Sequence, residues 1–134
     1  MCNEAGLLEE VVKRLISKVG VKVVILFGSR ARGDWLPWSD YDLLIIADFK
    51  EKYLDRIKSV LEAIGDIPID IEPHPYTLNE AITLLRRGVP TIVDALEEGK
   101  VLYAEEEELS KLMDIYKKLK MRGLRRTETT IIVP

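Results

Sequence analysis

The chain has 134 residues, enough for one domain with a buried core and too few for two. Hydrophobic residues make up 47% and charged residues 32%, the balance of a globular protein in water. A net charge of -3 argues against broad nucleic-acid binding, which depends on surplus Lys and Arg. No apolar run is long enough to span a membrane, and the single cysteine, Cys2, excludes an intrachain disulfide. These features favour a cytoplasmic protein.

The first half of the chain alternates between helix and strand patterns. Apolar residues recur at helical spacing over 5–19, and the β-branched run 21–27 predicts a central strand covered on both faces. A loop over 28–39 leads to a strand over 41–47. Helical spacing then returns over 49–64.

The next segments predict a further strand and two helices. Residues 68–72 alternate between apolar and acidic side chains, as in a strand with one face of each kind. Thr77 and Glu80 form a capping box ahead of a third helix, and a short fourth helix is expected over 90–96.

The last part of the chain predicts a short edge strand over 101–103 and a long helix that begins near Glu105. This helix carries an apolar stripe, expected to pack on the chain's own core, with a homodimer interface as the alternative: Leu109, Leu112, Met113, Tyr116 and Leu119. The tail over 127–133 has β character but no evident strand partner.

Together these elements predict one domain over 1–134, with a core at about 7–104 and a C-terminal helix and tail over 105–134. The element order favours an α/β (α+β) fold, in which a mixed β-sheet of four to five strands is layered with helices.

The loop after the central strand contains groups suited to phosphate. Gly28 and Ser29 allow a sharp turn whose backbone amides and hydroxyl can approach phosphate oxygens. Arg30 and Arg32 follow, and they are expected either to meet phosphate charge or to remain solvated loop residues.

Two carboxylates open the next strand. Asp40 and Asp42 point to the same face because side chains two apart in a strand share a face. Two like charges side by side are costly without a cation, and carboxylate oxygens are the ligands that Mg²⁺ prefers. The pair suits a magnesium site, although taken alone it favours an ordinary surface Asp-x-Asp at the start of a strand.

A third carboxylate lies in the strand over 68–72. Asp70, between Ile69 and Ile71, is favoured as a third metal ligand that could also accept the proton of an attacking hydroxyl. Glu72 lies on the same strand face and competes with it. Asp70 is preferred because its apolar neighbours are expected to place it deeper.

The spacing of these groups resembles a known family. Gly28-Ser29, followed after ten residues by Asp40-x-Asp42, is similar to the signature of the DNA polymerase beta-like nucleotidyltransferase superfamily. The fuller pattern, from Gly-Ser-Arg-Ala-Arg-Gly to Ser-Asp-x-Asp-Leu, resembles its minimal nucleotidyltransferase branch. The resemblance covers roughly residues 7–104, with Asp70 at the third-carboxylate position.

The resemblance implies transfer of a nucleoside monophosphate, with ATP as the expected substrate, to a hydroxyl with release of pyrophosphate. Gly28 and Ser29 would hold the β and γ phosphates. Asp40 and Asp42 would bind two Mg²⁺ ions, and Asp70 only the catalytic one.

The resemblance also implies a partner. Minimal nucleotidyltransferases are often paired with a HEPN protein in toxin–antitoxin modules, and only residues 105–134 follow the core here. A HEPN toxin is therefore the expected acceptor. The alternatives are a catalytically weak module that neutralises a partner by binding, and a nucleotide sensor.

Three aromatic residues near these motifs are given structural roles. Trp35 and Trp38 are expected to cap the core under the loop, with stacking on a nucleotide base as the alternative. His74 is expected to be a surface or loop residue rather than a catalytic one.

Overall fold

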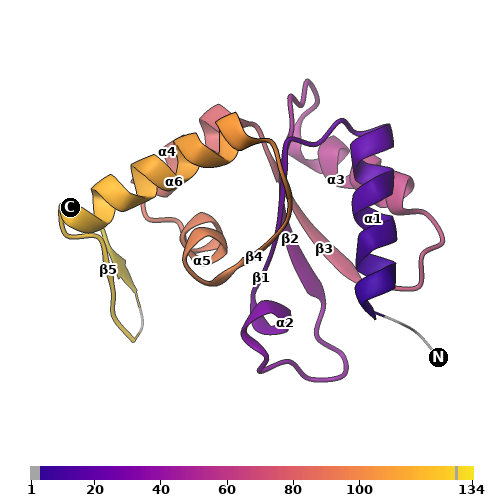
Figure 1. Cartoon of the computed structure of the whole chain (residues 1–134), viewed down its shortest axis with the longest axis horizontal. Coiled ribbons are helices and arrows are strands. Elements are labelled where there is room, and N and C mark those ends of the chain that lie inside the picture. The colour runs from indigo at the N-terminus through magenta and orange to yellow at the C-terminus, as the bar shows by residue number, and fades with distance from the viewer. Residues whose placement is uncertain (1–3, 129) are drawn as a thin grey trace.

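The computed structural model describes residues 4–128 and 130–134, so Cys2 lies outside the described residues. A four-stranded mixed sheet separates two layers of helices (Figure 1). The elements, in chain order, are α1 (Glu4–Lys18), β1 (Val23–Phe27), α2 (Ser29–Arg32), β2 (Tyr41–Ile46), α3 (Tyr53–Ile64), β3 (Ile71–Tyr76), α4 (Leu78–Arg86), α5 (Pro90–Glu98), β4 (Lys100–Ala104), α6 (Glu106–Met121), β5 (Arg125–Arg126) and β6 (Ile131–Ile132).

The strand order is β3-β2-β1-β4. β1 runs antiparallel to both of its neighbours, whereas β2 and β3 are parallel. All five residues of β1 are buried, which confirms the predicted central strand. The mixed sheet confirms the predicted fold class.

Helices cover both faces of the sheet. Viewed edge-on, α1 and α3 lie on one side, and α4, α5 and α6 lie on the other (Figure 1). Side chains alternate between the two cores: Leu43 and Ile45 of β2 pack with α1 and α3, whereas Leu44 and Ile46 pack with the other three helices. Asp42 shares a face with Leu44, so it points to the side of α4, α5 and α6.

The third strand lies further along the chain than the sequence predicts. It was expected over 68–72, but β3 spans Ile71–Tyr76 and contains Pro73 and Pro75. The amides of Tyr41 and Ala47 donate to the carbonyls of Asp70 and Tyr76. The backbone N–H and C=O groups of the even-numbered residues in this segment therefore point to β2. The two prolines therefore occupy positions that turn toward the open edge of the sheet, where a missing N–H costs no ladder bond.

The C-terminal elements pack on the chain itself. Leu112 and Tyr116 of α6 are buried in the second core, which confirms that the apolar stripe serves this chain's own packing. The tail forms a small hairpin in which β5 pairs with β6, a local partner that the sequence did not reveal. Val133 of this tail approaches Gly88, at the turn before α5.

The N-terminus of α4 has the capping residues that the sequence predicts. Thr77 and Glu80 form the predicted capping box, in which each side chain accepts from the other residue's backbone amide. We expect Thr77→Ala to lower the free energy of unfolding by about 1 kcal/mol, because one amide loses its partner. Urea denaturation measures this loss. Thr83→Ala, inside the same helix, is the control and should be neutral or slightly stabilising.

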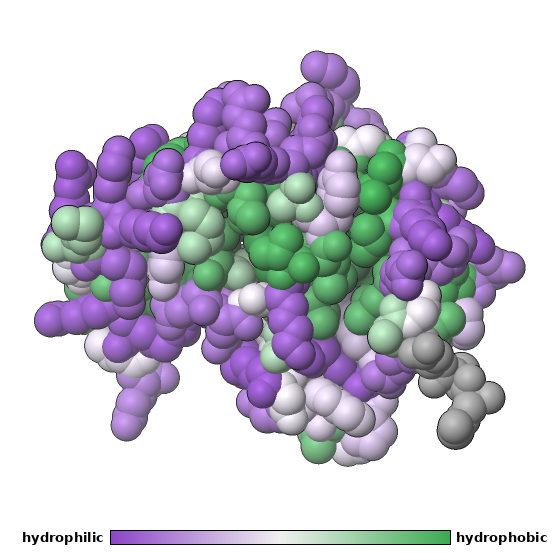
Figure 2. Space-filling model, viewed as in Figure 1, coloured by the Kyte–Doolittle hydropathy of each residue, from purple (hydrophilic) through white to green (hydrophobic). Residues whose placement is uncertain are grey.

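Apolar side chains gather over β4 and the neighbouring surface of α1 (Figure 2). Val101 of β4 has 51% of its surface exposed, and the strand carries a register shift opposite Val24 and Ile25. Such an irregularity makes an edge strand a poor template for further pairing.

No helix within the described part of the chain is both long and apolar enough to cross a bilayer.

Candidate active site

The turn after β1 has a conformation that requires glycine. Gly28 has φ 76° and ψ -159°, a region that residues with a Cβ rarely enter. The short helix α2 follows at once, where a loop was expected, and the amides of Ala31 and Arg32 donate to the Gly28 carbonyl. The amides at the start of this turn have no helical carbonyl to bind, so they are suited to an anion.

Three side chains from two strands form an acidic cluster beside this turn. Asp42 of β2 lies in register opposite Glu72 of β3, and their ligand atoms and those of His74 are all within 4.8 Å of one another. The Nε2 of His74 lies 3.2 Å from Oδ1 of Asp42. Parallel pairing of β2 with β3 therefore brings together groups that are thirty residues apart in the sequence.

The Asp42 carboxylate also lies close to the turn. A Cβ at Gly28 would overlap Oδ2 of Asp42, so only glycine lets the backbone approach this closely. Asp42 is half-buried, and it pairs in register with Phe27, the residue before the turn. The end of β1 and the start of β2 therefore hold the turn and the carboxylate against each other.

Like charges dominate the electrostatics of the cluster. The pKa of Glu72 is raised, first by its side-chain hydrogen bond with Asp42 and then by desolvation and the charge of Asp42. The charge of Asp40 raises it further, whereas His74 lowers it. Adjacent carboxylates that repel each other suit a divalent cation.

The raised pKa of Glu72 predicts how stability depends on pH without metal. The folded state holds this proton more tightly than the unfolded chain does, so the stabilisation is present at low pH and is lost as pH rises through the raised pKa. Glu72→Gln should remove this part of the pH dependence. Melting temperatures of the metal-free proteins between pH 4 and 7 measure it, and identical profiles for the two proteins would contradict the coupling.

The two other predicted carboxylates lie at the same end of the sheet. Asp40 and Asp70 are both exposed, one just before β2 and the other just before β3. Apolar neighbours do not place Asp70 deeper than Glu72, because Ile69 and Ile71 turn to the opposite core and both carboxylates are exposed. The structure brings Glu72, rather than Asp70, opposite Asp42.

Arg30 supports the loop from within. Its guanidinium donates to the carbonyls of Ser39 and Pro37, and it lies 4.2 Å from the ring of Trp35 and 4.5 Å from that of Tyr41. Only 7% of the Arg30 side chain is exposed. These contacts engage the guanidinium in holding the loop, a role that neither of the sequence-based interpretations included.

Of the other loop residues, one forms ion pairs and two are exposed aromatic residues. Arg32 forms ion pairs with Asp34 and with Glu98 at the end of α5, at 3.2 Å each. Trp35 packs on Arg30 yet is 46% exposed, and Trp38 is 76% exposed. Neither tryptophan packs in the core, so the expectation that both cap it is wrong; Arg30 takes the place beneath the loop.

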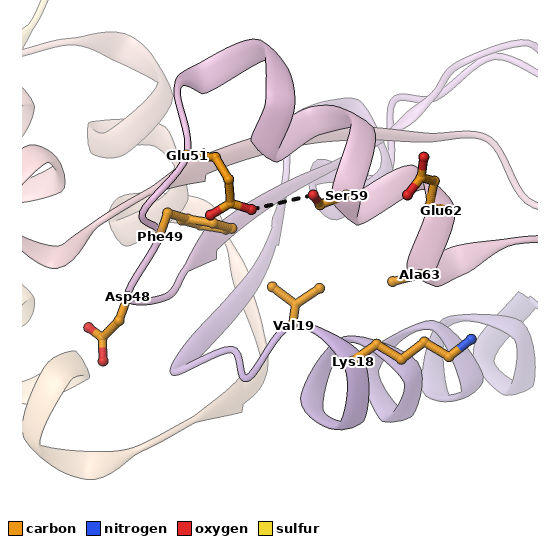
Figure 3. A pocket seen from close by; sticks show the side chains of 8 residues that line it. All are labelled: Lys18, Val19, Asp48, Phe49, Glu51, Ser59, Glu62 and Ala63. Atoms are coloured by element: carbon orange, nitrogen blue, oxygen red, sulfur yellow. Dashed lines mark hydrogen bonds between the residues drawn. The ribbon is translucent and has the colours of Figure 1, made fainter.

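Two cavities help to delimit the site. The cavity in Figure 3, of about 390 Å³, lies at the other end of β2, where α1, α3 and the segment after β2 meet. A cavity of about 290 Å³ lies nearer, and its lining includes Arg30, Tyr41 and Asp70. The acidic cluster itself lies beside an open turn rather than in either of these hollows.

His74 is the member of the cluster that the sequence analysis missed. A proline lies on each side of His74, yet strand alternation from Asp70 through Glu72 places His74 on the same face. That period of two was the available signal. The side chain is 19% exposed and lies in β3, so the expectation of a surface or loop histidine is wrong.

Comparison with known proteins agrees with this geometry. A family model described as "Nucleotidyltransferase domain" matches residues 8–130. The chain is 37% identical over 105 residues to "Putative protein adenylyltransferase MJ0604" of Methanocaldococcus jannaschii, covering 75% of this chain and 99% of that protein. It is 28% identical over 93 residues to a bifunctional uridylyltransferase/uridylyl-removing enzyme of Pseudomonas entomophila, covering 68% of this chain and 10% of that enzyme.

Solved structures share the fold. A toxin–antitoxin crystal structure with AMP-PNP matches with a TM-score of 0.57 and 18% identity, over 84% of this chain and 89% of that one. A complex of tri-AMPylated Shewanella oneidensis HEPN toxin with MNT antitoxin matches with a TM-score of 0.55 and 16% identity, over 86% of each chain. The chain belongs to the nucleotidyltransferase domain family, of the polymerase beta-like kind that its loop motif resembles.

Proposed function

We propose that this nucleotidyltransferase moves AMP from ATP to a hydroxyl group of a partner protein and releases pyrophosphate. The observation that carries the proposal is the pairing of Asp42 with Glu72 directly beside the Gly28 turn. An anion-binding turn next to a pair of repelling carboxylates suits a nucleoside triphosphate together with its cations.

The residues have separate tasks in this proposal. Gly28 and Ser29 bind the phosphates through backbone amides and the hydroxyl. Asp40 and Asp42 would hold two Mg²⁺ ions, with Glu72 or Asp70 as the third carboxylate. Such ions, when bound, stabilise charge on the attacking and leaving oxygens.

The third carboxylate would also accept the proton of the acceptor hydroxyl. Register with Asp42 favours Glu72. The family motif favours Asp70. Comparison of Glu72→Gln with Asp70→Asn separates the two residues. Only the substitution of the true third ligand should lower the rate of transfer by a factor of about 100 or more, because it removes one stabilising contact in the transition state.

A HEPN-type toxin is the proposed acceptor, which would make this chain its antitoxin in the cytoplasm. Support comes from the structural neighbours, one of which is an MNT antitoxin with an AMPylated HEPN toxin, and from the adenylyltransferase relative. The exposed Leu36 and Trp38 lie in the loop before Asp40, where an acceptor must approach. We do not assign them to the nucleotide.

Pyrophosphate release tests the proposal. Purified protein with ATP and Mg²⁺ should release pyrophosphate in amounts that follow the quantity of HEPN partner supplied. ATP binding without pyrophosphate release would instead identify a nucleotide sensor. Full neutralisation of the toxin in cells by Asp40→Asn, without any modification of the toxin, would identify a module that acts by binding alone.

A further inference from the structure

The Asp42 carboxylate has a close neighbour at each of its oxygens. Oδ1 lies 3.2 Å from the Nε2 of His74, and Oδ2 faces the Cα of Gly28, where a Cβ would overlap it. The side chain of Asp42 is only 24% exposed. The turn and the third strand therefore leave this carboxylate little freedom to rotate.

The chemistry of the contact fixes its direction. An ionised carboxylate can only accept a hydrogen bond, so the tautomer of His74 that carries its proton on Nε2 is the one that donates to Oδ1 of ionised Asp42. At 3.2 Å the contact lies at the long end of the range for an N–H···O bond. A nitrogen that carries this proton has no lone pair to offer a metal ion.

The imidazole ring is itself held in place. Phe27, which is buried, lies with its ring 5.0 Å from the His74 ring at an angle of 60°, within the range favoured for aromatic pairs. His74 pairs in register with Leu44, a fully buried residue of β2. The ring therefore packs on Phe27 of β1 and points to the carboxylate of Asp42 on β2.

We propose that His74 is a positioning residue that fixes the rotamer of Asp42 for cation binding without itself touching the cation. The inference rests on the proposed function of Asp42 as a metal ligand. Hydrogen-bond partners of ligating carboxylates set their orientation, and their loss typically lowers metal affinity or activity by a factor of about 10 to 100. His74 is thereby assigned a role that the family's three-carboxylate pattern does not include.

Two variants separate this role from others. His74→Gln keeps an N–H donor near the position of Nε2, whereas His74→Leu keeps bulk and removes the donor. Binding of Mn²⁺ to the protein, followed by electron paramagnetic resonance without any nucleotide or acceptor, gives a readout that does not depend on activity. Thermal melting of each metal-free variant shows that it is folded.

We expect His74→Leu to weaken Mn²⁺ binding by about 10- to 100-fold and His74→Gln to restore most of it. The melting temperatures should differ little, because the contact to Asp42 is only partly buried. Equal affinity for wild type and both variants would overturn the proposal. Direct ¹⁴N coupling between the imidazole and bound Mn²⁺ would also overturn it, since His74 would then be a ligand.

Failure of this inference and failure of the proposed function look different. If Asp42→Asn abolishes Mn²⁺ binding while the His74 variants bind normally, the metal site stands and the positioning role is wrong. If the His74 variants weaken Mn²⁺ binding but wild-type protein transfers no AMP, the positioning role stands and the proposed reaction is wrong.

Discussion

Asp42→Asn is expected to lower the rate of nucleotidyl transfer about 10³-fold or more, which corresponds to about 4 kcal/mol of transition-state stabilisation. Among the carboxylates of residues 4–128 and 130–134, Asp42 is the one that meets the Gly28 turn, Glu72 and His74 at once. Its charge should therefore be the hardest in the site to replace. Initial rates of AMP transfer at saturating Mg²⁺ and ATP measure the loss.

Asp42→Asn should lower activity without lowering the stability of the metal-free protein. Asp42 raises the pKa of Glu72, so removing its charge relieves repulsion in the metal-free protein. We expect the melting temperature of Asp42→Asn at pH 7 to equal or exceed that of wild type. Added Mg²⁺ should stabilise wild type but not the variant. A variant that loses both activity and stability would show that Asp42 is structural.

Gly28→Ala is expected to abolish most activity and to cost about 1–3 kcal/mol of unfolding free energy. The backbone at Gly28, with φ 76°, lies in a region that alanine avoids, and the added methyl group would displace Oδ2 of Asp42. Both the phosphate turn and the carboxylate would then lose their geometry. Urea denaturation and Mn²⁺ binding measure the two effects separately.

Gly20→Ala is the matched control for this prediction. Gly20 has nearly the same φ, 74°, but lies after α1 with no atom within 4 Å of the site of a Cβ. It should lose stability of the same order through backbone strain and keep full Mn²⁺ affinity. If the two variants bind Mn²⁺ equally well, the close approach of Gly28 to Asp42 has no functional importance.

Local patterns explain what the sequence predicted well. The Gly28 turn follows β1, and Asp40 and Asp42 lie at the start of β2, the next strand and the antiparallel neighbour of β1. Strand periodicity and the pairing of consecutive strands therefore place them together. The capping box at Thr77 is likewise set by neighbours three residues apart. Such features depend on short stretches of chain and were read directly from the residues.

Pairing between distant strands explains what the sequence could not give. The choice between Asp70 and Glu72 depends on the register of β3 against β2. The paired residues of these strands are about thirty positions apart in the sequence, and their register is fixed by packing. Prolines are uncommon within strands, so the sequence pattern did not predict a strand as far as His74. The role of Arg30 depends on where the loop folds back over Tyr41, a contact with no local signature.

The most direct test of adenylyl transfer uses ATP labelled at either the α or the γ phosphate, with wild type and Asp42→Asn side by side. Incubation with Mg²⁺ and a HEPN-type partner should place the α label on the partner, covalently and only with wild type. The γ label should remain in released pyrophosphate. Label from the γ phosphate on the partner, or equal α labelling by wild type and Asp42→Asn, would contradict the proposed function.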